Sequence, residues 1–271
     1  MPSWINENDP RSNVGPFAVM AGFSWESESE KKTILRASKM DAKNKLSDRI
    51  TLRMRHSLFK YFTDRKWAEA FLNGEVLFRS LSYFRDYEDK NVRGDHKEGV
   101  SVFRPGGGLI VTNHTQGRTF TMTDSAFEAI ANQEDIFAFC VSRSLTDELC
   151  KTFGAVVSVE ILKIPILCER IKSALPETAT FRAGRVEYYD PNDAPNPRWA
   201  LPDQIALSKF EGYKWQNEFR FLFSLTNALQ FEIGSHRIVM REGAQVPKPD
   251  EHHEYLLKTR SLVDICRIHE F

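Results

Sequence analysis

Residues 208–223, SKFEGYKWQNEFRFLF, carry the strongest structural pattern in the chain. Phenylalanine recurs at every second position from 219 to 223, with Arg220 and Leu222 in between. A period of two is typical of a β-strand, because successive side chains of a strand point to opposite faces of the sheet. We therefore expect a strand over 218–225 that begins at Glu218, with Gln216 projecting on the same face as Glu218.

Glu218 and Gln216 are the first candidate functional residues. A carboxylate at the end of a strand, with a carboxamide two residues earlier, suits the recognition of a ribose. Glu218 can accept a hydrogen bond from a 2′-hydroxyl group and stabilise positive charge that develops at an anomeric carbon, while Gln216 can orient a nucleophile. The alternative is a structural strand end in which Glu218 pairs with a Lys or Arg. These residues alone leave both interpretations open.

Upstream, residues 56–63 are rich in aromatic side chains and predict a strand on which Tyr61 and Thr63 share a face. Asp64 is a good N-cap for a helix over 64–73, and Gly74 ends that helix. A second strand is expected over 75–83. Tyr61 is either a half-buried strand aromatic or a ligand contact.

The remaining pattern predicts short strands mixed irregularly with helices. Further strands are expected over 99–104, 108–112, 117–122, 136–143, 153–161, 184–190, 229–240 and 262–269, and helices over 124–133, 145–151, 164–175 and 203–210. Because strands and helices do not alternate regularly, a doubly wound parallel sheet is disfavoured and an α+β fold is expected.

Taken together, these elements resemble ADP-ribosyltransferases: a Tyr-x-Thr strand, a helix that ends at glycine, a second strand, and a late strand with Gln-x-Glu. Residues 59–86 are also similar to DarT-like toxins that modify nucleic acids. The late motif, Lys209 followed by Trp215-x-x-Glu218-x-Arg220, resembles an uncharacterised prokaryotic family associated with defence. The mRNA-modifying ADP-ribosyltransferase toxin of an anti-phage toxin–antitoxin–chaperone system is a further functional analogy. This chain has Tyr61 where many ADP-ribosyltransferases have His or Arg.

The resemblance implies split, mixed or antiparallel β-sheets flanked by helices, with NAD as the cofactor. It implies that Tyr61 and Thr63 hold a ribose, that Glu218 stabilises an oxocarbenium-like transition state, and that Gln216 helps to place the acceptor. A middle motif supports the cofactor in this superfamily, and the sequence offers two candidates for it: Ser80, Ser82 and Tyr83, or else Ser142 and Ser144. Arg79 and Phe84, beside the first candidate, are further expected cofactor contacts, and Arg79, Arg85 or Arg93 would attract phosphates. The nicotinamide would lie against Tyr83 or Phe84.

Charge is balanced overall but not along the chain. With 37 basic and 37 acidic residues and a pI near 7.1, the protein is not a general polycation. Residues 31–55 nevertheless hold nine basic residues against two acidic ones. This segment is expected to be a basic helix. It is either a solvated face, or docks on the chain's own acidic stretch 124–148, or forms a basic strip that contacts RNA, DNA or an acidic partner. The candidate contacts are Lys31, Lys32, Arg36, Lys39, Lys43, Lys45 and Arg49. Residues 1–30 are expected to be a flexible arm and residues 56–271 a single catalytic domain.

Several classes of function are disfavoured. The chain lacks a GxGxxG motif after a strand, a GxxxxGK[ST] motif, HExxH and GxSxG. Two His-containing polar stretches, around Asp95, His96 and Glu98 and over 251–254, are better explained as surface loops than as metal sites. Four cysteines without a CxxC pair are typical of a reduced, cytoplasmic protein, and the longest apolar run of six residues is too short for a membrane span.

The sequence therefore leads to the hypothesis of a cytoplasmic, NAD-dependent ADP-ribosyltransferase that modifies a nucleic acid, with RNA favoured over single-stranded DNA. A bacterial toxin of this kind would have an antitoxin or chaperone as its partner. The alternative is a non-enzymatic interaction module in a defence or regulatory complex. A nuclease is a weaker candidate, because no close Asp/Glu/Lys or His pair stands out.

Overall fold

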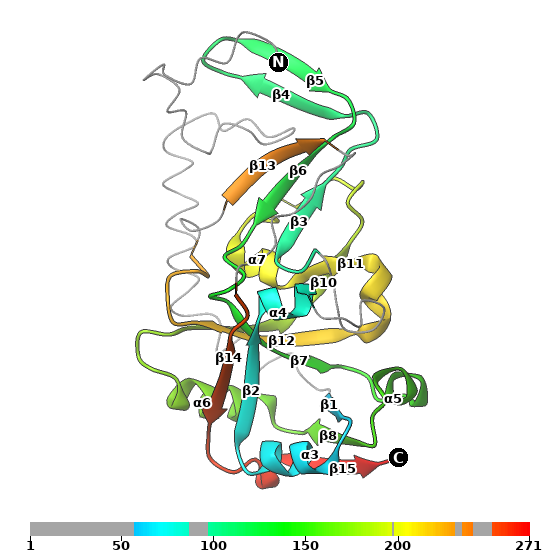
Figure 1. Ribbon diagram of the computed structural model, residues 1–271, viewed down its shortest axis with the longest axis vertical. Helices are drawn as coiled ribbons and strands as arrows, with labels where there is room; N and C mark the ends of the chain where they lie inside the picture. Colours follow the sequence, from blue (N-terminus) through cyan, green and yellow to red (C-terminus); the bar gives the residue numbers. More distant parts are fainter. Residues whose placement is uncertain (1–56, 87–96, 197, 231–234, 241–250) are drawn as a thin grey trace.

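The computed structural model describes residues 57–86, 97–196, 198–230 and 251–271, and the backbone of 235–240 (Figure 1). The expected arm over 1–30 and the expected basic helix over 31–55 lie outside the described residues. The seven candidate nucleic-acid contacts between Lys31 and Arg49 therefore lie outside them as well.

The main sheet has eight strands, in which β14, β2, β7, β1, β8 and β15 are neighbours in that order, while β12 pairs with β7 and β9 pairs with β12. All of these pairings are antiparallel. The strands are β1 (Leu58–Phe62), β2 (Glu75–Ser80), β7 (Phe137–Ser142), β8 (Val157–Ile161), β9 (Thr180–Arg185), β12 (Glu218–Ser224), β14 (Glu254–Lys258) and β15 (Cys266–Glu270).

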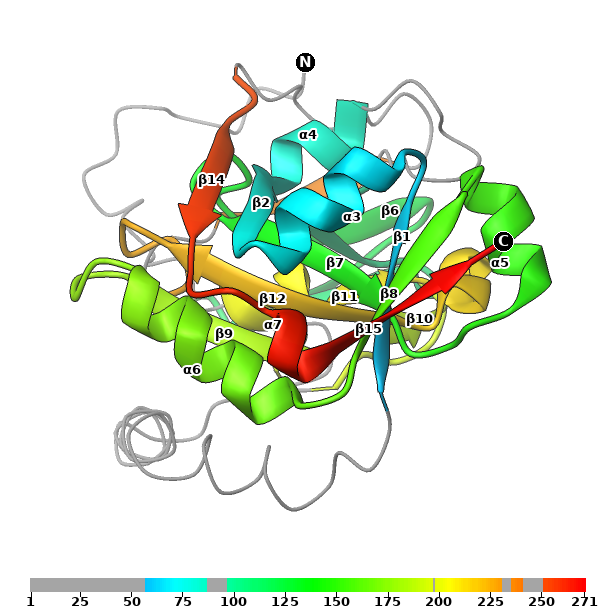
Figure 2. The same ribbon diagram turned by 90° about the horizontal axis from the view of Figure 1, so that it is seen from below.

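The sheet divides at β7. One edge of β7 pairs with β12 over its whole length, from Phe137 to Ser142. The other edge is shared, because β2 pairs with its first two residues and β1 pairs with Ser142. Two arms therefore leave β7, one made of β2 and β14 and the other of β1, β8 and β15 (Figure 2).

Five helices and three smaller sheets complete the described part of the chain. The helices are α3 (Arg65–Leu72), α4 (Leu81–Asp86), α5 (Asp147–Phe153), α6 (Ile164–Ala174) and α7 (Pro202–Ala206), with 3₁₀ turns η1 (Glu211–Gln216) and η3 (Val263–Ile265). The smaller sheets are β3 (Val100–Phe103), β6 (Ser125–Ile130) and β13 (Ser235–Met240); the hairpin β4 (Leu109–Asn113) and β5 (Arg118–Met122); and the parallel pair β10 (Glu187–Tyr189) and β11 (Ser208–Phe210). The hairpin lies at the far end of the molecule from the main sheet (Figure 1). The expected α+β class is confirmed.

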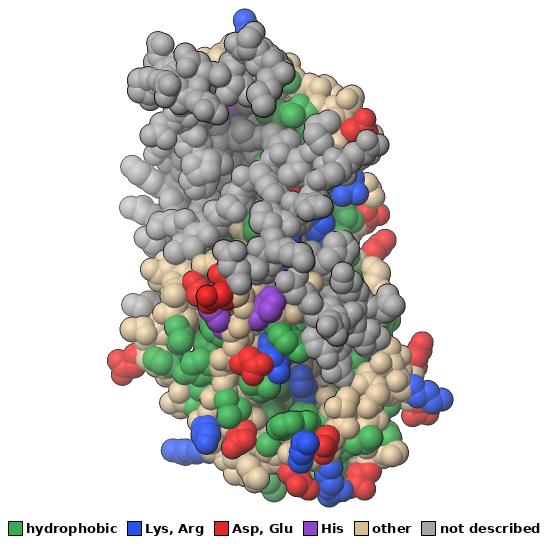
Figure 3. Space-filling view, in the orientation of Figure 1, with side chains coloured by type: hydrophobic (Ala, Val, Ile, Leu, Met, Phe, Trp, Pro, Cys, Tyr) green, Lys and Arg blue, Asp and Glu red, His purple; other side chains and the backbone are tan. Residues whose placement is uncertain are grey.

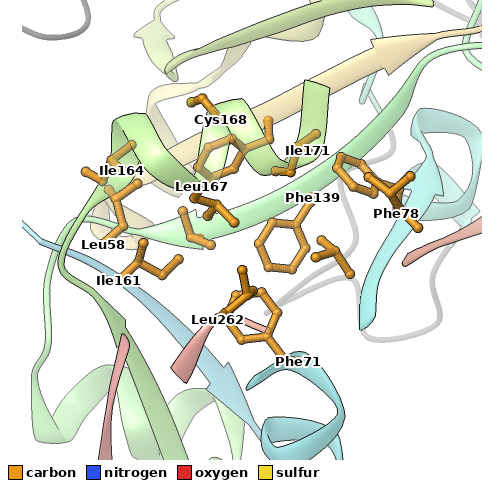
Figure 4. Packing of buried hydrophobic residues seen from close by; sticks show 14 of the residues in the cluster. Leu58, Phe71, Phe78, Phe139, Ile161, Ile164, Leu167, Cys168, Ile171 and Leu262 are labelled. Carbon is orange, nitrogen blue, oxygen red and sulfur yellow. The ribbon is translucent and has the colours of Figure 1, made fainter. Parts of the chain in front are cut away.

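The largest core covers one face of the main sheet. The three phenylalanines of β12 enter it from the sheet, and α6 adds Ile164, Leu167, Cys168 and Ile171 at the spacing of one helix face (Figure 4). A second, smaller core covers the opposite face and includes Leu222. The alternation in β12 therefore separates Phe219, Phe221 and Phe223 from Glu218, Arg220 and Leu222 as the sequence predicts.

Some expected elements are wrong. Residues 124–133 do not form a helix, since β6 pairs with β3 on one edge and with β13 on the other. Ala126, Glu128 and Ala129 favour a helix locally, but burial between two strands overrides that preference. The expected strand over 75–83 ends at Ser80, where α4 begins, and the expected helix over 203–210 ends at Ala206, before β11.

Other elements agree closely or shift in their bounds. The expected helices over 64–73, 145–151 and 164–175 correspond to α3, α5 and α6. Two strands were missed in whole or in part: β14 has no counterpart among the expected strands, and β9 begins at Thr180 rather than at 184. The face shown in Figure 3 carries basic and acidic side chains interspersed over the described part of the main sheet, in keeping with the balanced charge.

Candidate functional site

Glu218 stands at a sharp turn of the chain into β12. The residue before it, Asn217, has a left-handed backbone with φ of 45°, a conformation that Asn adopts more readily than most residues. Gln216 is consequently in the 3₁₀ turn η1 and not in the strand. The side chains of Gln216 and Glu218 nevertheless share a partner. The ammonium group of Lys209 on β11 donates to the amide oxygen of Gln216 at 2.9 Å and to the carboxylate of Glu218 at 3.4 Å.

A buried network of two carboxylates and two cations surrounds this point. Arg220 donates from Nε to Glu218 at 2.9 Å, and from Nη1 and Nη2 to the two oxygens of Glu98 at 2.6 Å and 2.9 Å. Lys209 completes the network at 3.4 Å from Glu218 and 3.9 Å from Glu98. The exposed fractions are 7% for Glu218, 5% for Lys209, 2% for Glu98 and 1% for Arg220. The network is therefore neutral in total and almost fully removed from water.

This environment decides the ionisation of Glu218. Burial alone would raise the pKa of its carboxyl group, but the charges of Arg220 and Lys209 outweigh burial and hold that pKa well below its usual range. The pKa of Arg220 is raised well above its usual value, because Glu98 and Glu218 outweigh its burial. Glu218 is thus an anion at any physiological pH, which suits an electrostatic role and makes it a poor general base.

Two neighbours of Glu218 are kept neutral. Burial, and then the charge of Glu218, raise the pKa of the Cys140 thiol, which hydrogen-bonds the Glu218 carboxylate. The same two causes raise the pKa of Tyr188 to about 12. The Tyr188 hydroxyl oxygen accepts a hydrogen bond of 2.8 Å from the backbone N–H of Glu218. Both groups therefore fix the start of β12 without adding charge.

Tyr61 lies on the same face of the sheet as Glu218, with β7 between them. Its hydroxyl group donates to the carbonyl oxygen of Ser144 at 2.7 Å, and the hydroxyl oxygen of Ser144 accepts from the Asn217 side chain at 2.6 Å. Burial raises the pKa of Tyr61 to about 12. A short chain of hydrogen bonds thus connects Tyr61 to the residue next to Glu218. Thr63, by contrast, is exposed beyond the end of β1.

The first candidate for the middle motif forms a separate cluster at the junction of β2 and α4. The hydroxyl groups of Ser80 and Ser82 are 2.7 Å apart, and Ser82 donates to the backbone carbonyl of Glu251. The guanidinium of Arg79 lies 4.1 Å from the centre of the Tyr83 ring, and Phe84 packs against the second core. This cluster meets β7 at Phe137 and Ala138. Phe137 and Ala138 are five and four residues before Ser142 on β7, which is on the order of 13–17 Å along the strand at about 3.4 Å per residue.

The second candidate adjoins Glu218 directly. Ser142 pairs with Glu218 across the two strands, and its hydroxyl group donates to the backbone carbonyl of Gln216 at 2.8 Å. The backbone N–H of Ser144 donates to the hydroxyl oxygen of Ser142 at 3.1 Å. Of the expected site residues, the fold therefore brings together Tyr61, Gln216 and Glu218 with Ser142 and Ser144.

Sequence reasoning missed the contribution of Glu98. It stands 120 positions before Glu218 in the chain, and only the packing of the loop before β3 against β12 makes it a partner of Arg220. Its neighbours Asp95 and His96 lie outside the described residues. Within the described residues no group of three or more His, Cys, Asp or Glu is placed to hold a metal ion.

Comparison of the chain with protein-family models, with curated proteins and with solved structures gave no match. None of the described helices is both long and apolar enough to cross a bilayer. The function must accordingly be argued from the site itself.

Proposed function

We propose that this protein is an NAD-dependent ADP-ribosyltransferase that modifies a nucleic acid, with RNA favoured, and that Glu218 stabilises the transition state. The observation that carries the proposal is a carboxylate held as an anion by Arg220 and Lys209 at the end of a strand, with Tyr61 on the same face. A fixed negative charge in a site poor in water is what a developing oxocarbenium ion requires.

The residues at this point fit a ribose-bearing cofactor. The ionised Glu218 is a hydrogen-bond acceptor, and the Tyr61 hydroxyl group, which already donates to Ser144, retains capacity to accept. NAD supplies an anomeric carbon whose bond to nicotinamide breaks, with the electron pair leaving on nicotinamide. Glu218 would lower the energy of the positive charge, and Gln216 would orient the acceptor group, which would form the new bond and release its proton to water. We assign the supporting middle motif to Ser142 and Ser144, since they adjoin Glu218.

The biological setting follows from the resemblance to defence-associated ADP-ribosyltransferases. We propose a cytoplasmic toxin whose partner is an antitoxin or chaperone protein. Thr63 would lie at the rim, where it is exposed, and the basic segment over 31–55 would add phosphate contacts.

A second candidate function is favoured by one feature of the same network. Each oxygen of Glu218 already faces a cationic donor, and only 7% of the residue is exposed. This is also the geometry of a structural ion pair that fixes a strand. In that case the protein is a non-enzymatic interaction module.

The deciding experiment compares Glu218→Gln with Glu98→Gln. Both variants remove one negative charge from the Arg220 network, so both lose stability, but only Glu218 is placed to touch the reacting carbon in our proposal. Purified protein is incubated with labelled NAD and RNA, single-stranded DNA or cell protein. We expect Glu218→Gln to reduce transfer to RNA by about 10²–10³-fold, as for the loss of one electrostatic stabiliser, while NAD binding by calorimetry is retained. Glu98→Gln should keep transfer per folded molecule.

Equal losses of transfer in the two variants, in proportion to their loss of folded protein, would favour the interaction module. The same conclusion follows if the unmodified protein neither transfers label nor binds NAD. Loss of NAD binding in Glu218→Gln would assign this residue to cofactor binding and not to the transition state.

A further inference from the structure

Two arginines flank the start of β12. Arg143 follows the last residue of β7, and its backbone N–H donates to the carbonyl oxygen of Asn217 at 2.8 Å. Arg185 is the last residue of β9 and pairs with Phe219 across the strands. Because β7 and β9 lie on opposite edges of β12, the two arginines belong to strand ends on either side of the start of β12.

Neither arginine forms an ion pair with a carboxylate of the described residues. The Arg143 side chain donates to the amide oxygen of Asn217 at 3.2 Å. Burial, and then the positive charge of Arg185, lower the pKa of Arg143, which means that the two positive charges repel each other. A bound anion would relieve this repulsion, and guanidinium groups match the geometry of phosphate oxygens.

A cluster of aromatic rings is connected to Arg143 through the hydrogen bonds of Asn217, Ser144 and Tyr61. Trp215 is 40% exposed, and its ring lies 5.7 Å from the Phe153 ring, which in turn lies 5.3 Å from the ring of Tyr61. Trp215 precedes Asn217, the partner of Arg143, by two residues. Exposed aromatic side chains together with basic side chains are the combination that proteins use to bind unpaired bases and the phosphates between them.

We propose that Arg143, Arg185 and Trp215 form a binding surface for single-stranded nucleic acid, in which the arginines hold phosphates and the indole stacks on a base. Duplexes are disfavoured, because their bases are already stacked inside the helix. The inference rests on the proposed function only in naming the bound strand as the acceptor; the binding itself requires no catalysis.

A free dinucleotide also carries phosphates and bases, but the surface is better suited to a strand. Arg185 and Lys214, which precedes Trp215, are both exposed, so their charges are accessible to a chain that continues past the site. The test has to separate these two sources of phosphate.

The test measures the binding of a labelled single-stranded 20-mer RNA by fluorescence anisotropy between about 50 and 200 mM salt, where affinity that depends on phosphate contacts falls steeply with salt. For Arg143→Gln with Arg185→Gln we expect affinity to fall at least about tenfold and the slope of log affinity against log salt to decrease by about 1.4, the value for two phosphates on a single strand. Trp215→Ala should weaken binding about tenfold with an unchanged salt slope, as for one stacked base.

Arg182→Gln is the matched control, because Arg182 is on the same strand β9 as Arg185 but pairs with Leu222, away from the start of β12. It should bind RNA like the unmodified protein. Thermal unfolding checks that each variant is folded, and Arg143→Lys with Arg185→Lys, which keeps both charges, should retain most of the affinity and all of the salt slope.

Unchanged RNA binding in the double Gln variant overturns the inference. The inference is also overturned if the double Gln variant loses NAD binding, measured by calorimetry, but keeps RNA binding. It is overturned as well if RNA binding is lost only in a variant with Lys39→Gln and Lys43→Gln in the basic segment. Equal affinity for a 20-base-pair duplex also overturns it. RNA binding that depends on both arginines, without transfer of label from NAD, would support the surface and reject the transferase.

Discussion

At the scale of single residues, the buried Arg220 network depends on the pairing of each of its charges. Burying a charge costs several kcal/mol unless a partner compensates for the lost hydration. Arg220 therefore needs both Glu218 and Glu98, and Lys209 balances the second negative charge. Removal of one carboxylate leaves an uncompensated cation, which is why Glu98→Gln is a suitable stability control for Glu218→Gln.

The lowered pKa of Glu218 predicts a specific dependence of stability on pH. Its folded-state pKa lies below the unfolded value of 4.5, so its contribution is present above about pH 4.5 and is lost as the pH falls below that value. We expect the difference in unfolding free energy between the unmodified protein and Glu218→Gln to shrink by up to about 1.4 kcal/mol per pH unit in this range. Urea unfolding at pH 7, 5, 4 and 3.5 measures it. A difference that stays constant with pH would contradict the ionised state of Glu218.

At the scale of secondary-structure elements, two glycines end helices with positive φ but in different surroundings. Gly74, with φ of 96°, separates α3 from β2, and a Cβ atom there would lie 2.5 Å from the carbonyl oxygen of Thr259. Gly154, with φ of 59°, caps α5, and a Cβ atom there would meet nothing within 4 Å. Only Gly74 is therefore required for both its backbone conformation and its lack of a side chain.

This contrast predicts unequal effects of alanine. Gly154→Ala should lower the free energy of unfolding by about 1 kcal/mol, the cost of a left-handed non-glycine residue. Gly74→Ala adds the cost of overpacking against a backbone that cannot move aside, about 1–3 kcal/mol more. Chemical denaturation of both variants gives the comparison, and equal losses would show that the close approach of Thr259 relaxes freely.

At the scale of the whole molecule, stability depends on the core that covers one face of the main sheet. Phe78 on β2 is fully buried, and its ring lies 4.9 Å from that of Phe223 and 5.8 Å from that of Phe139. It thereby joins the β2 arm to the central strands β7 and β12. The preceding residue, Leu77, faces the other way and is 39% exposed.

Alanine at these two adjacent positions should therefore have very different effects. We expect Phe78→Ala to cost about 3–5 kcal/mol through lost burial and a cavity, and Leu77→Ala to cost less than about 1 kcal/mol. Urea unfolding measures both, with Phe78→Leu as a milder change should the alanine variant not fold. Similar values at the two positions would mean that the β2 arm is not anchored through Phe78.

Much of the local structure can be predicted from the sequence. The alternation after Glu218 predicts β12, and the cap at Asp64 with the stop at Gly74 predicts α3, because these signals depend on residues that are neighbours in the chain. β6 shows the limit of such prediction. Its alanines and glutamate favour a helix, and only its pairing with β3 and β13 makes it a strand.

For the site, the sequence by itself determined the residue types: a carboxylate that opens an aromatic strand, an arginine two positions later, and a tyrosine on an earlier strand. The tertiary structure decided which of them meet. It joined Glu98 to Arg220 and Tyr61 to Ser144, and it left Ser80 and Ser82 at the other end of β7. The physical reason is that hydrogen bonds and ion pairs act over a few ångströms. Strand pairing and register, which no single segment encodes, bring distant residues within that range.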